Sequence, residues 1–212
     1  MDGGAVRRDT GGASSPSGRR REREREQMRN LLLDTARGIA AEQGWQAVTI
    51  RRIADRIEYT SPVIYQYFSG KDALVSEVMC IGFRDITDRI EATMAEPVDS
   101  RLAALATAFW SFAFGAPELY QAMNGQAGVS FDGADMPPEV SRGFMVFHAV
   151  LESIAAEQGR RLRDPAAAVH TMWAYLHGFV ALAMSGRVAG GAEQGERYML
   201  ASLQPLFDAQ LA

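Results

Sequence analysis

The side chains best suited to contact another molecule are concentrated between Thr49 and Leu74. Helical spacing predicts two short helices here, the first with an apolar face formed by Ile50, Ile53, Ala54 and Ile57. The second is expected to open at Thr60 or Ser61 and to leave four side chains facing outward: Ser61, Val63, Tyr65 and Gln66. Two helices this short cannot bury much surface alone, so we expect them to pack on neighbouring helices and to expose side chains that contact another molecule. The pattern favours a helix-turn-helix whose second helix enters the major groove of DNA.

The flanks of these two helices carry the signals that such a motif requires. Thr49 stands where its hydroxyl can accept from free N–H groups of the first helical turn. Pro62 is tolerated in the first turn of the second helix, because its missing N–H has no partner there. The preceding helix is expected to open with the charge run of residues 19–30, to pair Glu26 with Arg29, and to end at Gly44.

Charge is unevenly distributed along the 212 residues. Residues 1–71 hold 13 Lys+Arg and 9 Asp+Glu, so +4, whereas residues 72–212 hold 9 and 17, so −8. This split fits a small nucleic-acid module joined to an acidic partner domain. The total of −4 argues against a protein that coats nucleic acid over its whole surface, and the 47% hydrophobic content is ample for a core.

The cellular context is predicted from simple absences in the sequence. Cys80 is the only cysteine, which excludes an intrachain disulfide and favours a reducing compartment. The N-terminal residues have no apolar run that could serve as a signal peptide. The most apolar segments, near 102–116 and 172–184, fall short of the roughly 20 residues that a membrane span needs. We therefore predict a cytoplasmic protein that does not bind a membrane.

The chain divides into three predicted parts: a disordered tail (1–18), the helix-turn-helix domain (19–70) and a helical domain (71–212). No convincing strand or repeat is present, so the predicted fold class is all-α. In the third part, proline and glycine punctuation predicts helices over 72–94, 99–114, 117–123, 138–158, 165–187 and 193–211, with a loop at 124–135. Pro205 is expected to bend the last helix.

Taken together, these residues resemble the N-terminal DNA-binding domain of the TetR family of bacterial transcriptional regulators. The family pattern stands here as Gly44, Thr49, Ile53-Ala54, Ile64-Tyr65-Gln66-Tyr67-Phe68, Lys71 and Leu74, within a gapless match from about Arg29 to Val78. Three positions depart from it: Glu58 replaces the usual glycine, Tyr59 the usual valine and Tyr67 the usual histidine. A turn without glycine must either accept a positive φ at Glu58 or avoid it.

The resemblance implies a set of DNA contacts on these positions. Residues near phosphate or base edges would be Thr49, Arg51 and Arg52 at the first helix, and Ser61, Pro62, Val63 and Gln66 on the second. Tyr65, Tyr67 and Lys71 would clamp phosphates, which sets register rather than sequence preference. Arg19, Arg20 and Arg21 would form either an arm along the DNA or only a solvated helix start.

The C-terminal segment Trp173-Ala-Tyr-Leu-His177-Gly178 resembles the Trp-x-x-x-His-Gly signature of one TetR subgroup. Membership implies an all-α homodimer of about nine helices per chain, with three binding DNA and the rest forming an effector pocket and dimer interface. The last two helices would form a four-helix bundle with those of the partner. Aromatic, Met and His side chains of this half are the candidates for lining a pocket for a small apolar effector: Phe109, Trp110, Phe112, Met123, Phe144, Phe147, His148, Trp173 and His177.

Other chemistries find little support. His148, His170 and His177 are the only histidines and are not spaced as ligands of one metal, and no catalytic motif stands out, so neither cofactor nor enzymatic activity is predicted. The leading hypothesis is a ligand-responsive regulator, a repressor released from palindromic double-stranded operator DNA by a small molecule. The alternative is a helical small-molecule-binding or interaction protein that does not bind specific DNA. Glu58 and the mixed-charge run at 21–26 support that alternative.

Overall fold

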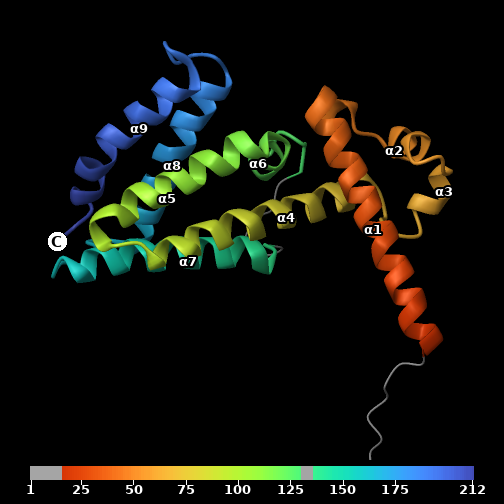
Figure 1. Ribbon diagram of the computed structural model, residues 1–212, viewed down its shortest axis with the longest axis horizontal. Helices are drawn as coiled ribbons and strands as arrows, with labels where there is room; N and C mark the ends of the chain where they lie inside the picture. The colour runs from red at the N-terminus through yellow and green to blue at the C-terminus, as the bar shows by residue number, and fades with distance from the viewer. Residues whose placement is uncertain (1–15, 130–135) are drawn as a thin grey trace, which may run out of the picture.

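The computed structural model describes residues 16–129 and 136–212, so most of the predicted tail lies outside the described residues. Within them the protein is helical with no strand, which confirms the all-α prediction. Figure 1 shows the helices in order. Their bounds are α1 Pro16–Gln43, α2 Ile50–Arg56, α3 Ser61–Ile64, α4 Lys71–Ala92, α5 Val98–Gly115, α6 Pro117–Met123, α7 Pro138–Glu157, α8 Pro165–Met184 and α9 Gly191–Asp208, with single 3₁₀ turns at Trp45–Ala47 and Thr93–Ala95.

Several local predictions are confirmed. Gly44 ends α1 with φ 78°, a left-handed value that glycine adopts without steric cost. Thr49 caps α2, since its hydroxyl accepts a hydrogen bond from the Arg52 N–H at 3.2 Å. Asp164 caps α8 through the Ala167 N–H at 3.0 Å. These devices involve residues within four positions of one another, which is why sequence reveals them.

Other boundaries differ from the prediction. The helix of the recognition segment spans only Ser61–Ile64, because the N–H groups of Gln66 and Tyr67 bond to the carbonyls three residues back, those of Val63 and Ile64, and not four back as in an α-helix. The last helix ends at Asp208 rather than Leu211. Leu211 instead forms a β-bridge with Leu162, and the N–H of Ala212 donates to the Arg161 carbonyl at 2.8 Å.

Helix α4 joins the two halves of the molecule. In Figure 1 it runs from the α1–α3 unit into the larger helical unit, where it packs along α7 and under α6 and α5. Nine of its residues are buried, from Leu74 at its start to Ile90 near its end. A helix buried at both ends can transmit a change of position from one unit to the other.

Helix α8 begins at Pro165 as predicted and ends at Met184, before the expected Arg187, but its apolar stretch is longer than the run near 172–184. It has 20 residues and is long and apolar enough to cross a membrane by length and composition alone, a property that the core helix of a water-soluble protein can share. Here α8 packs on α9, α7 and α5. Only 33% of its most apolar window is buried within the protomer, so an apolar face of α8 remains uncovered.

The α4–α7 contact contains a buried hydroxyl with no hydrogen-bond partner, Thr87 Oγ1. A buried polar group without a partner costs about 1–3 kcal/mol, so Thr87→Val should raise the free energy of unfolding by about 1 kcal/mol in urea denaturation. Thr93→Val is the matched control, because its hydroxyl donates to the Ile90 carbonyl at 2.6 Å. The control should be neutral or destabilising; equal gains in both variants would contradict the explanation.

Candidate DNA interface and ligand site

The residues expected to read bases lie together at one end of the molecule. Pro62, Tyr65 and Gln66 are exposed on and just after α3, and Ser61 and Val63 are half-buried beside them. The apolar side of the same segment is covered, since Ile64 is fully buried and Phe68 nearly so. The segment is thus anchored through one face and offers the other to solvent.

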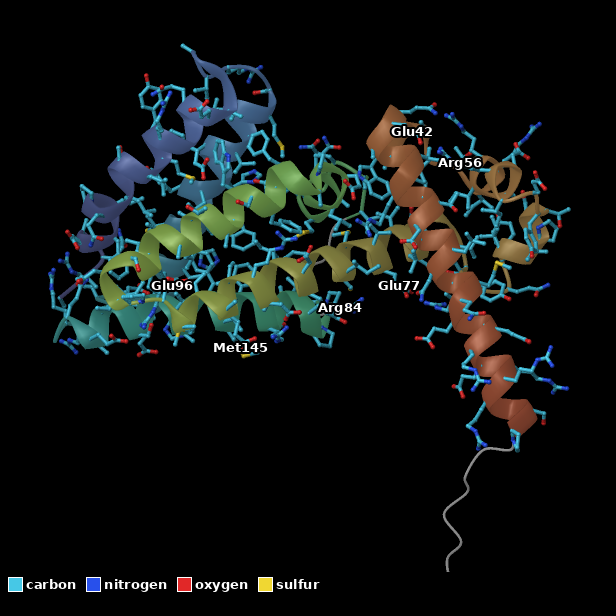
Figure 2. All side chains as sticks on the ribbon, viewed as in Figure 1. Glu42, Arg56, Glu77, Arg84, Glu96 and Met145 are labelled. Atoms are coloured by element: carbon cyan, nitrogen blue, oxygen red, sulfur yellow. The ribbon has the colours of Figure 1, made fainter. Side chains whose placement is uncertain are left out.

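The two arginines of α2 are placed differently. The Arg51 side chain is 89% exposed, with Asp55 at 3.9 Å as its ion-pair partner, and is available for a base edge or phosphate. The Arg52 guanidinium instead donates to the Ala47 carbonyl at 3.3 Å and to the Gln43 amide oxygen. Arg56 likewise forms a bidentate pair with Glu42 of α1 (Figure 2). Arg52 and Arg56 therefore hold α2 onto the α1 end, while Arg51 points outward.

The three residues expected to bind phosphate also differ in their exposure to solvent. Tyr65 is 56% exposed, whereas Tyr67 and Lys71 are half-buried. The Lys71 ammonium donates to the Trp45 carbonyl at 3.0 Å, which ties the start of α4 to the turn after α1. Of the three, Tyr65 is the most exposed to solvent, and phosphate contacts by all three residues stay predictions.

Sequence reasoning missed the role of Arg29. This residue pairs with Glu77 of α4, not with Glu26 of its own helix as expected. Its guanidinium also donates to the Tyr67 carbonyl at 2.9 Å and lies 4.6 Å from the Phe68 ring centroid. Arg29 thus fastens the end of the recognition segment between α1 and α4. The partners lie 38 and 48 residues away along the chain, beyond what local spacing can indicate.

Glu58 accepts the left-handed conformation, with φ 59°. Such a conformation costs a non-glycine residue about 1–2 kcal/mol, partly offset by the greater chain entropy that glycine would lose. Glu58→Gly should therefore raise stability by about 0.5 kcal/mol and, by removing a charge that repels phosphate, also strengthen DNA binding. Glu58→Gln separates the two effects: it should strengthen DNA binding without the gain in stability. A loss of stability in the glycine variant would contradict the strain argument.

The two halves are joined by a buried contact between α1 and α6. The Arg37 guanidinium donates to the Glu118 carboxylate at 3.0 and 3.3 Å, and Glu118 is only 8% exposed. The indole N–H of Trp45 donates to the Glu118 backbone carbonyl at 2.9 Å. Because Lys71 binds the Trp45 carbonyl, one network links α1, the turn after it, α4 and α6. We call this network the Glu118 joint.

Most of the aromatic residues proposed for a pocket form solid core. Phe109, Phe112 and Phe147 are essentially fully buried, and Trp173 packs edge-on against Phe109 and Phe147 at ring distances of 5.4 and 5.9 Å. Trp110 is also buried and stacks on Phe114 at 4.7 Å. Met123 fills the space beside Gly82. Neither the hollow between α7 and α8 nor the cleft between α6 and α8, the two in which other proposed residues lie, is lined by these side chains.

Two of the proposed residues, Phe144 and His148, do line a hollow. It has a volume of about 550 Å³ and lies between α7 and α8. Its walls are Met136, Phe144, Met145, His148, Pro165, Ala166, Val169 and His170. The Phe144 ring stacks on His170 at 5.9 Å and packs against Trp173 at 5.6 Å. Met145 is 63% exposed at the rim (Figure 2). The lining is apolar apart from the two imidazoles.

His177 lies apart from that hollow, in a smaller cleft of about 270 Å³ between α6 and α8. Its Nδ1 and the Tyr120 hydroxyl are 2.5 Å apart. Burial lowers the pKa of the His177 imidazole and raises the pKa of the Tyr120 hydroxyl, so both groups are neutral at pH 7. The imidazole therefore stays uncharged near neutral pH and extends the polar wall of this cleft.

Redox or metal chemistry gains no support from the described part of the chain. Burial raises the pKa of the Cys80 thiol to about 11, which suppresses the reactive thiolate at neutral pH. Among the described residues, no group of three His, Cys, Asp or Glu side chains is placed to hold a metal ion.

The fold and the exposed α2–α3 face define an all-helical protein that joins a helix-turn-helix unit to a larger helical unit. Family comparison gives the same division. Residues 32–78 match the model of bacterial regulatory proteins of the tetR family, and residues 102–204 match the tetracyclin repressor-like C-terminal domain. The chain belongs to the TetR family of transcriptional regulators. The Trp-x-x-x-His-Gly subgroup stays a prediction.

One curated relative resembles part of this chain in sequence, and two solved structures resemble it in fold. The HTH-type transcriptional repressor KstR2 of Rhodococcus jostii (strain RHA1) is 35% identical over 96 residues, which are 44% of this chain and only 43% of the relative. A protein with unknown function from Rhodococcus sp. RHA1 has a similar structure (TM-score 0.73, 20% identity, 86% of this chain and 94% of that one). So does the TetR family regulator PfmR from Thermus thermophilus (TM-score 0.61, 17% identity, 81% and 96%).

Proposed function

We propose that this regulator is a ligand-responsive repressor that leaves palindromic operator DNA when a small molecule binds its C-terminal domain. The observation that carries the proposal is the exposed α2–α3 face, anchored from behind and connected through the Glu118 joint to the larger helical unit. The relative KstR2, a transcriptional repressor by name, supports the sign of regulation.

The active form is proposed to be a homodimer that pairs α8 and α9 with their copies. The exposed side chains of these helices include a set of small or apolar ones, Ala167, Ala174, Leu182, Tyr198 and Ala201, and on α9 also polar ones such as Glu193, Arg197 and Gln204. Leu182 and Tyr198 are 46% and 51% exposed in the protomer. An apolar face of this kind is stabilised when a second copy covers it. A dimer also places two recognition segments on successive major grooves, about 34–36 Å apart.

The effector site is proposed to be the hollow between α7 and α8. Its volume of about 550 Å³ suits a small molecule, and its lining favours an apolar one, with His148 and His170 as polar groups that could orient it. A ligand shifts the protein only through its different affinity for two conformations. We propose that the ligand-bound conformation changes the position of α6 and α4, and that the Glu118 joint carries this change to α1.

A titration of labelled duplexes from the region upstream of the protein's own gene tests the proposal. Fluorescence anisotropy should detect binding to a palindromic site roughly 1,000-fold or more tighter than to a scrambled duplex at the same salt concentration, the lower bound for specific regulators. Equal affinity for both duplexes down to low salt, where phosphate attraction is strongest, would instead favour the helical protein without specific DNA binding.

The effector is sought by mass spectrometry of small molecules extracted from the purified protein. Ala166→Trp should fill the hollow and abolish retention of a co-purified apolar molecule while leaving operator affinity intact, because Ala166 lies at the wall between α7 and α8. Retention of the same molecule by Ala166→Trp would place the effector elsewhere.

A further inference from the structure

The first three turns of α1 contribute nothing to the core. Residues 16–27 include no buried side chain, and Figure 1 shows this end of α1 running past α2 and α3. The family match begins at residue 32, so residues 16–27 lie outside the matched range.

One face of this segment is a row of arginines directed at the recognition segment. Arg21, Arg25 and Arg29 follow at i, i+4 and i+8 and therefore share a side of the helix. The Arg25 guanidinium carbon lies 5.9 Å from the Tyr67 ring centroid, and Arg29 donates to the Tyr67 carbonyl. Arg29 and Arg25 thus contact the recognition segment, and Arg21 continues the row toward the N-terminal end of α1.

Arg21 and Arg25 share a hollow with the recognition segment. It has a volume of about 360 Å³ and is lined by Arg21, Glu24, Arg25, Met28, Gln66 and Tyr67. Glu24 accepts a hydrogen bond from Arg20 at 2.8 Å, so its negative charge already has a cationic partner. The hollow therefore presents two guanidinium groups next to Gln66, a residue on the face proposed to read bases.

We propose that this hollow seats a backbone phosphate of the DNA that flanks the half-site, held by Arg21 and Arg25. Arginine suits this role because its planar donors match phosphate oxygens in pairs. A phosphate contact sets position and adds affinity but reads no sequence. The extension of α1 thus lengthens the DNA footprint outward from the major groove. The inference rests on the proposed function, since it requires the recognition segment to lie on DNA.

The salt dependence of DNA binding by the full-length protein tests this placement. The probes are a duplex of about 40 base pairs with the operator at its centre, the same duplex trimmed to the operator, and a scrambled duplex of the full length. On the long operator duplex, Arg21→Ala/Arg25→Ala should lower affinity about tenfold or more. The double variant should also make the slope of log affinity against log salt shallower by about 1 per protomer. Its preference for operator over scrambled DNA should be retained, because phosphates carry no sequence information.

Arg19→Ala/Arg23→Ala is the matched control. It removes the same charge at the same i, i+4 spacing from roughly the opposite side of the helix. It should shift affinity and slope by less than half as much, and trimming the flanks should erase the difference between the two variants. Equal losses of DNA affinity in the two double variants would indicate diffuse charge attraction and would overturn the assignment. A changed dimer mass of Arg21→Ala/Arg25→Ala in sedimentation would overturn it as well. Absence of operator preference in the unmodified protein would refute the proposed function itself, a separate result.

Discussion

Tyr65→Ala should lower operator affinity by about 100-fold with little change in stability. The tyrosine is 56% exposed just after α3, so its removal opens no core cavity. A hydrogen bond to a charged phosphate contributes about 1.5 kcal/mol, which is about tenfold in affinity. A dimer on a palindrome loses the contact twice, which squares the factor. Anisotropy titration on the operator duplex measures the loss.

Tyr59→Ala is the matched control for this prediction. It removes the same side chain from the turn one residue after Glu58, where the tyrosine is 46% exposed. Its effect on affinity should be within about threefold, since single exposed side chains outside the contact set contribute little. If Tyr65→Ala binds as tightly as the unmodified protein, Tyr65 does not contact DNA and the placement of the recognition segment is wrong.

Arg37→Ala should destabilise the protein by about 2–4 kcal/mol. The substitution leaves the Glu118 carboxylate, 8% exposed, without its cationic partner, and an uncompensated buried charge is more costly than the lost attraction. Arg37→Ala/Glu118→Gln removes that charge and should recover at least half of the loss. Urea denaturation of both variants and of Glu118→Gln alone measures these differences.

The same variants separate stability from coupling. In Arg37→Ala/Glu118→Gln the link between α1 and α6 is reduced to the indole of Trp45 and the Glu118 carbonyl. If the Glu118 joint carries the effector response, this double variant should still bind operator but should release it less completely when the co-purified molecule is added. If Arg37→Ala/Glu118→Gln releases the operator as completely as the unmodified protein, the signal travels through α4 and not through the Glu118 joint.

Sequence revealed the parts of the molecule that local chemistry determines. The Thr49 cap, the end of α1 at Gly44 and the proline-initiated helices depend on residues within one or two turns. The long-range contacts were missed because nothing local marks them. Local sequence indicates only that Glu118 is an acidic residue in the first turn of α6, yet it pairs with Arg37, which lies 81 positions earlier in the chain. Arg29 reads as a partner of Glu26, yet it holds Tyr67 and Glu77.

The lining of the candidate pocket also depends on long-range packing that the sequence pattern does not reveal. Phe109 and Phe144 have the same side chain on helices of similar character, but Phe109 is sealed in the core and Phe144 borders a hollow. Whether neighbouring helices fill the space beside an aromatic ring depends on tertiary packing, which a periodic pattern does not encode. The remaining wall residues were not among the expected ones: Met136, Met145, Pro165, Ala166, Val169 and His170.

The most direct test of the central claim is selection of binding sites by the purified protein from a pool of random duplexes. We predict enrichment of a palindrome whose half-site centres lie about one helical turn apart; a dimer should bind it, and Tyr65→Ala should abolish the enrichment. If an intact dimer enriches no sequence even at low salt, the claim of specific DNA binding is wrong, and the chain has the helix-turn-helix fold but does not use it to recognise an operator.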